Sequence, residues 1–180
     1  MNGYFSAATK SDLIKLGVYQ IGGGLIGIAI IAKSAFNAGA FNELVFLFYL
    51  IFLLFFGYSI FCGWMCIKFK EHALLFSLIN QFLQLLHVSI AGFSFSYTAG
   101  FHLDMGVDLT DSFHISFDAG LSNLRIFINN HSRIVFINFN LIAFYLLYWI
   151  DRLRKQVKLE NEIQEADSIG VIEPGFETSN

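Results

Sequence analysis

The segment from residue 44 to residue 67 carries no charged side chain, and this feature limits the fold more than any other. Its 24 residues lie between Glu43 and Lys68 and are rich in Phe and Leu. About 20 consecutive apolar residues are enough for a helix to cross a bilayer. Only 14% of the whole chain is charged, compared with about 25% in a typical soluble domain. The sequence therefore predicts an integral membrane protein.

Three further apolar stretches are close to the length of a membrane-spanning helix. We predict four spans, over residues 13–32, 44–67, 73–92 and 134–150. Lys and Arg are enriched in cytoplasmic loops, and 8 of the 11 basic residues lie on the cytoplasmic side if the N-terminus is there. We therefore expect a multi-pass cell-membrane protein with both termini in the cytoplasm. The first span is interpreted as uncleaved, because no small-residue cleavage site follows it.

The chain divides into two parts by composition. Residues 1–151 are expected to form a single membrane domain. Residues 152–180 are expected to be cytoplasmic, with a charged helical extension of the fourth span and then a flexible acidic tail from residue 166.

Between the third and fourth spans, apolar and polar residues alternate, which is typical of strands with one buried face. The alternation is unbroken over residues 101–109 and 113–121. The predicted fold class is therefore membrane α+β, with a small antiparallel four-stranded β-meander (93–129) on the extracytoplasmic side. Its predicted strands are 93–97, 101–109, 113–121 and 124–129.

A three-residue connection between the two central strands keeps their apolar side chains on one face. In this register Asp104 lies opposite Asp118, and Asp108 lies opposite His114. The apolar face needs a second layer to cover it. We expect the outer ends of the spans to provide that cover, with lipid headgroups or the sheet of a second copy as alternatives.

Three side chains on the polar face, His102, Asp104 and Asp118, are weak candidates for metal ligands. Directly opposed carboxylates destabilise a sheet, and carboxylates with an imidazole can bind a divalent ion. The alternative is that Arg125, expected opposite Gly120 and diagonal to Asp118, neutralises Asp118. Two or three ligands on an exposed sheet do not make a closed metal site. The sequence therefore predicts no metal and no cofactor.

Asn80, Gln84 and His87 follow i, i+4, i+7 spacing and would share one stripe of a helical third span. Such a stripe can line a polar path for ions or protons, or it can form hydrogen bonds between helices. The second interpretation is favoured, because residues 73–92 contain no Asp, Glu, Lys or Arg. In the first span, Gly23 and Gly27 have the Gly-x-x-x-Gly spacing that permits close helix packing.

The sequence contains neither His-Glu-x-x-His nor Gly-x-Ser-x-Gly, and no convergent set of acid, base and nucleophile is visible. A net charge of −3 argues against nucleic-acid binding. We expect a non-enzymatic binding, sensing or assembly subunit of a membrane complex. Its partners would be the lipid bilayer and a second copy, as a homo-oligomer, or another membrane protein. The alternative is an oligomeric channel or transporter component with a polar path along the third span.

Overall fold

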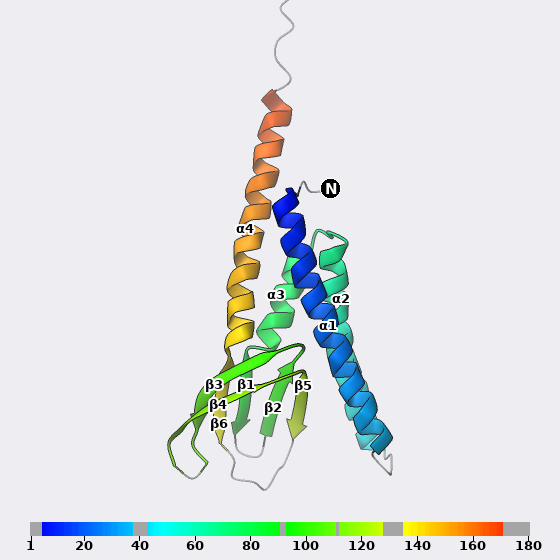
Figure 1. The fold of residues 1–180 in the computed structure, drawn as a ribbon, viewed down its shortest axis with the longest axis vertical. Helices are drawn as coiled ribbons and strands as arrows, with labels where there is room; N and C mark the ends of the chain where they lie inside the picture. Colours follow the sequence, from blue (N-terminus) through cyan, green and yellow to red (C-terminus); the bar gives the residue numbers. More distant parts are fainter. Residues whose placement is uncertain (1–4, 38–42, 91–92, 111, 128–134, 171–180) are drawn as a thin grey trace, which may run out of the picture.

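A computed structural model of the chain describes residues 5–37, 43–90, 93–110, 112–127 and 135–170. Within these residues the fold is α+β, with four helices and one antiparallel sheet of six strands (Figure 1). The predicted class is confirmed in this coarser form. The four-stranded meander is wrong, because two strands that were assigned from the sequence to helices complete the sheet.

The first two helices, α1 (Ala7–Asn37) and α2 (Glu43–Ile67), run side by side in opposite directions (Figure 1). Gly17 and Gly63 mark a close approach, since a Cβ on Gly17 would lie 2.6 Å from the carbonyl oxygen of Gly63. Gly27 lies against the ring of Phe56 on α2. Both helices are long and apolar enough to cross a membrane. That test uses length and composition alone, and soluble core helices or N-terminal signal sequences also pass it.

The third and fourth predicted spans are each divided between a helix and a strand, so the expectation of four long spanning helices is wrong. Helix α3 (Ala73–Leu83) has only 11 residues and leads into β1 (Leu86–Ile90). Strand β6 (Phe136–Asn140) leads directly into helix α4 (Leu141–Gly170). Strand β1 alternates apolar and polar residues throughout, and β6 does so from Ile137 to Asn140. This is the strand period rather than the helix period.

The change from strand to helix at Asn140 has a clear local cause. The side-chain Oδ1 of Asn140 accepts hydrogen bonds from the backbone N–H groups of Ile142 and Ala143, at 3.1 and 3.3 Å. Asn is among the preferred residues for capping helix N-termini in this way, because the first N–H groups have no partner within the helix.

The other strands are β2 (Phe93–Thr98), β3 (His102–Asp108), β4 (His114–Gly120) and β5 (Asn123–Phe127). The order across the sheet is β4-β3-β6-β1-β2-β5. The β3–β4 pair has the predicted register, with Asp104 opposite Asp118 and Asp108 opposite His114. The predicted pairing of β2 with β3 and of β4 with β5 is wrong. Strand β6 lies beside β3, and β5 pairs with β2.

One face of the sheet is apolar and the other is largely polar. Met105, for example, has Phe117 and Phe139 as its neighbours on the two adjoining strands. Helix α2 covers only the β2 side of the apolar face, where the Tyr97 ring packs 4.9 Å from the ring of Phe55. Phe117 is 68% exposed and Phe139 is 50% exposed. The helices therefore provide only part of the cover that was expected from the sequence.

The sheet curls, so that its polar face is concave. Strands β4 and β5 form opposite edges, yet only Leu121 and Ser122 separate them in the chain. The Ser122 hydroxyl donates to the carbonyl of Gly23 at 2.8 Å and accepts from the N–H of Gly100 at 2.9 Å. Gly100 has a φ of +115°, a conformation that glycine adopts readily.

Gly23 itself lies against the turn between β2 and β3. A Cβ at this position would approach the backbone of Ala99 and Gly100 to 2.5 Å. Of the two glycines singled out for helix packing, Gly27 therefore faces α2 and Gly23 faces the sheet.

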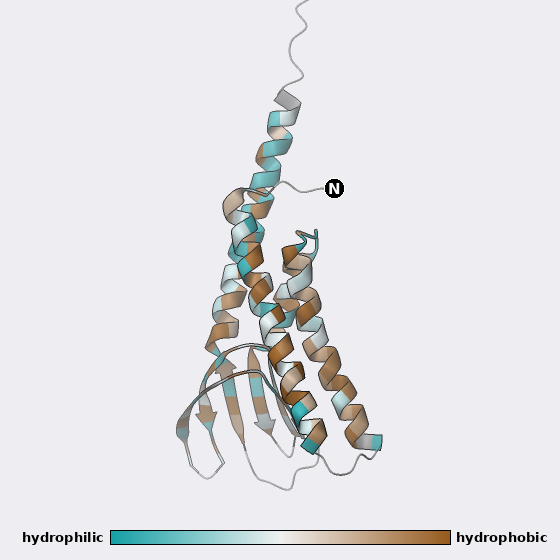
Figure 2. Cartoon of the chain, turned by 45° about the vertical axis from the view of Figure 1, so that its right-hand side comes forward, coloured by the Kyte–Doolittle hydropathy of each residue, from teal (hydrophilic) through white to brown (hydrophobic). Residues whose placement is uncertain are grey.

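The charged part of α4 extends beyond the other helices and is hydrophilic, whereas α1 and α2 are hydrophobic over most of their length (Figure 2). The tail expected from residue 166 is helical as far as Gly170, and its remainder, 171–180, lies outside the described residues. Glu160 accepts side-chain hydrogen bonds from Ser6 at 2.7 Å, Thr9 at 2.8 Å and Gln156 at 3.2 Å. Although burial alone would raise the pKa of Glu160, these bonds and one from the Ser6 N–H together lower it.

Candidate functional site

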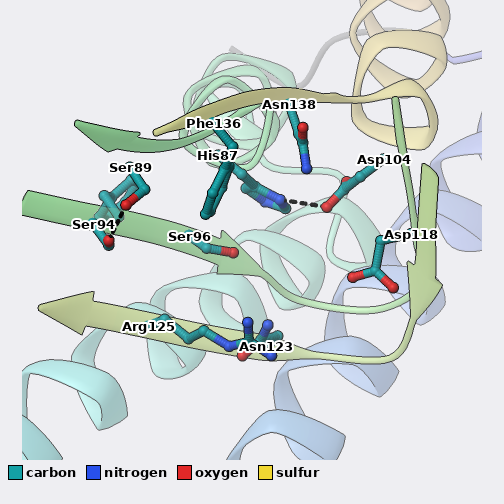
Figure 3. Close-up of a pocket in the computed structure, with 11 residues that line it drawn as sticks. His87, Ser89, Ser94, Ser96, Asp104, Asp118, Asn123, Arg125, Phe136 and Asn138 are labelled. Carbon is teal, nitrogen blue, oxygen red and sulfur yellow. Dashed lines mark hydrogen bonds and ion pairs between the residues drawn. The ribbon is translucent and has the colours of Figure 1, made fainter. Parts of the chain in front are cut away.

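The concave face of the sheet surrounds a pocket of about 260 Å³ (Figure 3). All six strands contribute to its wall, including both edge strands, which is possible only because the sheet curls. The lining residues are mostly polar: His87, Ser89, Ser94, Phe95, Ser96, Asp104, Asp118, Asn123, Arg125, Phe136 and Asn138. The pocket therefore brings both acidic and basic side chains to one small volume.

A buried pair forms one side of the pocket. The Nδ1 atom of His87 lies 2.6 Å from Oδ2 of Asp104 (Figure 3), and the two residues are 3% and 4% exposed. Because a carboxylate only accepts hydrogen bonds, Nδ1 carries the proton. The other ring nitrogen lies 3.1 Å from the Thr98 hydroxyl and 3.2 Å from the Tyr97 carbonyl. His87 is therefore fixed at both nitrogens.

His102 lies next to this pair, with its ring centre 6.1 Å from that of His87. Its Nε2 atom is 3.7 Å from Oδ2 of Asp118. Gly120 faces His102 across the β3–β4 pair, and a Cβ there would lie 2.8 Å from the imidazole ring. The absence of a side chain at Gly120 therefore makes room for His102.

The three weak metal candidates come together in the structure. One potential ligand atom from each of His102, Asp104 and Asp118 lies within 4.8 Å of the others. Two atoms of this group, Nδ1 of His102 and Oδ1 of Asp104, are buried and have no hydrogen-bond partner in the described structure. An imidazole nitrogen and two carboxylate oxygens form a donor set suited to a divalent transition metal.

Arg125 does not occupy the position that was expected from the sequence. It lies on β5 opposite Ser96, rather than opposite Gly120 on β4. It lines the pocket from the other edge of the sheet, while the ion pair of Asp118 is with His102. Arg125 is therefore not on a strand next to Asp118, and the expectation that it neutralises Asp118 from such a strand loses its structural basis.

Asp108 and His114 face each other but remain outside the ligand cluster. The N–H of Thr110 donates to Asp108 at 2.8 Å, and the Ser112 hydroxyl lies 2.6 Å from Nε2 of His114.

Asn80, Gln84 and His87 do not share one helical stripe, because α3 ends at Leu83 and His87 lies on β1. Asn80 donates to the Ser59 hydroxyl of α2 at 3.2 Å. Gln84 accepts from the N–H of Ala99 at 2.9 Å. Asn80 and Gln84 thus connect α3 to its neighbours, while His87 belongs to the pocket.

Sequence reasoning missed the contribution of β1 and β6, which supply His87, Phe136 and Asn138 to the pocket wall. The alternation in Leu86–Ile90 and in 137–140 was the available signal. It was hidden because each short strand adjoins an apolar helix and extends that helix to about the length of a membrane span.

The site is thus a mostly polar pocket inside a curled sheet, with a cluster of potential metal ligands in its wall. Comparisons with protein-family models, with curated proteins and with solved structures found no match for this chain. The polarity of the sheet and the chemistry of the pocket are therefore the basis for assigning a function.

Proposed function

We propose that this chain is a non-enzymatic membrane protein that binds a small polar ligand in the concave face of its sheet. The observation that carries this proposal is the reversed polarity of the sheet. His87 and Asp104 are buried inside the curl, whereas Ile115 and Phe117 are 59% and 68% exposed outside it. A soluble protein rarely exposes such an apolar patch, but a membrane β-barrel has this arrangement when it holds water inside and contacts lipid outside.

The surface of α2 supports contact with lipid. Only 17% of its most apolar 18-residue window is buried within the chain. A helix of this composition in a soluble core is mostly buried, because apolar surface in water is unfavourable. The exposed face of α2 and the exposed face of the sheet together favour a bilayer as their common surroundings.

The contact at Gly23 supports a place for the sheet at bilayer depth. Gly23 lies near the middle of the predicted first span, 13–32, and it packs on the β2–β3 turn. The sheet lies beside the half of α1 and α2 remote from the charged end of α4 (Figure 1). We therefore place the sheet in the outer half of the bilayer, rather than wholly outside it, with both termini cytoplasmic.

The size of the pocket limits its ligand. A volume of about 260 Å³ is slightly below the range of about 300–1,000 Å³ that is typical of drug-sized ligands.

Strand β6 lines the pocket and continues through Asn140 into α4. This continuity supports a sensing role, in which a ligand contacts the same segment that reaches the cytoplasmic extension.

Cysteine labelling in liposomes tests the proposal with two neighbouring positions of β4. Cys62 and Cys66, both fully buried, are first replaced by alanine. Asp118→Cys on the concave face is then expected to react with an impermeant maleimide added outside the vesicles. Phe117→Cys on the apolar face is expected to react only after the protein is denatured.

Equal labelling of the two variants in liposomes would overturn the proposal, because both faces would then contact water. Protection of both would overturn it as well, since the pocket would be closed to solutes. Formation of disulfide-linked dimers by Phe117→Cys alone would show that a second copy, rather than lipid, covers the apolar face.

A channel or transporter component is the second candidate, and a group of buried amides favours it. Gln20, Gln81 and Gln84 are each at most 1% exposed and keep side-chain atoms without a hydrogen-bond partner in the described structure. Buried amides of this kind are typical positions for bound water. Proton or cation flux into protein-containing liposomes that is lost in His87→Gln, at a temperature where this variant remains folded, would favour this candidate. Absence of flux in the unmodified protein would exclude it.

A further inference from the structure

Three potential ligands are held together by the pairing of β3 with β4. His102 and Asp104 are two residues apart on one strand, so their side chains share the concave face. Asp118 lies directly opposite Asp104. The backbone therefore fixes all three positions and keeps one ligand atom of each within 4.8 Å of the others. Little chain entropy remains to be lost when an ion binds.

Two buried atoms of this cluster lack a partner. They are Nδ1 of His102, on a residue 6% exposed, and Oδ1 of Asp104, on a residue 4% exposed. Native proteins rarely leave buried polar atoms unsatisfied, because the desolvation of each atom is then uncompensated. A cation held by this cluster would compensate the carboxylate of Asp104, whose Oδ1 otherwise has no partner.

Protonation of His102 is the simplest alternative, since its Nε2 faces Asp118 at 3.7 Å. It would neutralise one carboxylate. It would also place a second proton on Nδ1, which would then be a buried donor without an acceptor, and Oδ1 of Asp104 would remain unpaired. A bound cation supplies a partner for Oδ1 of Asp104, whereas protonation of His102 leaves that buried atom unpaired.

The donor atoms indicate the class of metal. Ca²⁺ and Mg²⁺ are hard cations that prefer oxygen ligands throughout. Zn²⁺ and Mn²⁺ also accept imidazole nitrogen. Three protein ligands leave at least one coordination position open. The Asp118 side chain is 68% exposed and lines the pocket, so an ion has a route of entry and its open position can face the pocket.

His87 supports the cluster from behind. It binds Oδ2 of Asp104 at 2.6 Å, and the Thr98 hydroxyl lies 3.1 Å from its other nitrogen. A residue in this position orients a carboxylate without binding the ion, and loss of such a partner commonly weakens metal affinity by about 10–100-fold.

We propose that His102, Asp104 and Asp118 bind one divalent transition-metal cation, with His87 as a positioning residue for Asp104. The inference rests on the proposed function, because it names the ion as a ligand of the same pocket. An open position on the ion would then receive water or a small coordinating solute.

The test uses the full chain, purified in detergent without a histidine tag and treated with a chelator. Zn²⁺ titration by calorimetry is expected to show one saturable site per chain, and Mg²⁺ is expected to show none. Asp118→Asn is expected to weaken Zn²⁺ binding at least tenfold. Asp108→Asn is the matched control, because Asp108 is a carboxylate on the same face but outside the cluster. This variant should bind Zn²⁺ with unchanged affinity.

Co²⁺ serves as a spectroscopic probe for the role of His87. His87→Gln is expected to lower Co²⁺ affinity by about 10–100-fold and to alter the visible absorption of the bound ion. A merely structural role would lower the unfolding temperature and leave that spectrum unchanged.

Absence of saturable Zn²⁺ binding by the unmodified chain would overturn the metal proposal. So would binding that survives Asp118→Asn but is lost in His114→Gln, because the ion would then occupy a surface site. If metal binding fails while Asp118→Cys and Phe117→Cys still label differently, the proposed function stands without a metal. Equal labelling of those two positions overturns the proposed function whatever the metal result.

Discussion

At the scale of single residues, the buried pair of His87 and Asp104 is the most consequential contact in the sheet. Its hydrogen bond is 2.6 Å long, and both residues are nearly inaccessible to solvent. A buried pair of this kind adds little net stability when intact, but the loss of one partner is costly because a buried charge is then uncompensated.

We therefore expect His87→Ala to lower the free energy of unfolding of the metal-free protein by about 3–5 kcal/mol. His114→Ala is the control, because His114 is exposed on the neighbouring hairpin, and it should change the free energy by no more than about 0.5 kcal/mol. Denaturant unfolding in detergent with a chelator present measures both. If both variants lost the same free energy of unfolding, the His87–Asp104 pair would have no particular role in stability.

The positions of the three potential metal ligands on their strands could be predicted from the sequence, but the contact of Asp104 with His87 could not. The strict alternation over residues 101–109 and 113–121 sets the register that brings Asp104 opposite Asp118. His87 lies 14 residues before the start of that alternation at residue 101. Its strand, β1, has no backbone pairing with β3, because β6 lies between the two strands. A local pattern predicts which residues pair within a hairpin. It does not predict which strand, distant in the sequence, lies between two others in the sheet.

At the scale of elements, α1 and the sheet are joined where Gly23 meets the turn at Ala99 and Gly100. The backbones are so close that a methyl group would approach the turn to 2.5 Å. A methyl group on the neighbouring Gly22 would meet nothing within 4 Å outside the backbone of its own helix. The two glycines therefore provide a matched pair in one helix.

Gly23→Ala is expected to destabilise the protein by about 1–3 kcal/mol, which is the usual cost of inserting a methyl group into a packed contact. Gly22→Ala is expected to be neutral or to stabilise by up to about 1 kcal/mol, because alanine favours the helix. Thermal unfolding of the two variants in the same detergent provides the comparison. A larger loss in Gly22→Ala would contradict the contact at Gly23.

The elements that could be predicted from the sequence were those whose apolar residues follow one pattern without interruption. Helix α2 is apolar throughout, and the β3–β4 pair alternates without a break. Strands β1 and β6 are only five residues long and adjoin helices. Their alternation was therefore absorbed into a longer apolar run, and the predicted meander lost the strand that lies at the centre of the sheet.

At the scale of the whole molecule, Glu160 connects the beginning of the first helix to the last one. Its carboxylate accepts hydrogen bonds from Ser6, Thr9 and Gln156, which lower its pKa below the ordinary value of 4.5 despite partial burial. The folded state thus favours the ionised form. The stabilisation is fully present above about pH 4.5 and is lost as the pH falls through the lowered folded-state pKa.

We expect the unfolding temperature of the unmodified protein to fall more steeply below pH 4.5 than that of Glu160→Gln. Glu162→Gln serves as the control, because Glu162 is exposed and forms a 3.6 Å pair with Lys158. Its acid profile should follow that of the unmodified protein. Parallel profiles for the unmodified protein and Glu160→Gln would contradict a role for this contact.

The central position of β6 sets the order in which this molecule can be completed. Strands β3 and β4 form one hairpin, and β1, β2 and β5 form a second group, but β6 alone pairs with both β3 and β1. It is also the last strand to be synthesised among the described residues. The two half-sheets therefore cannot be joined, nor the pocket wall completed, before residue 140 has been made, directly ahead of the final helix in the chain.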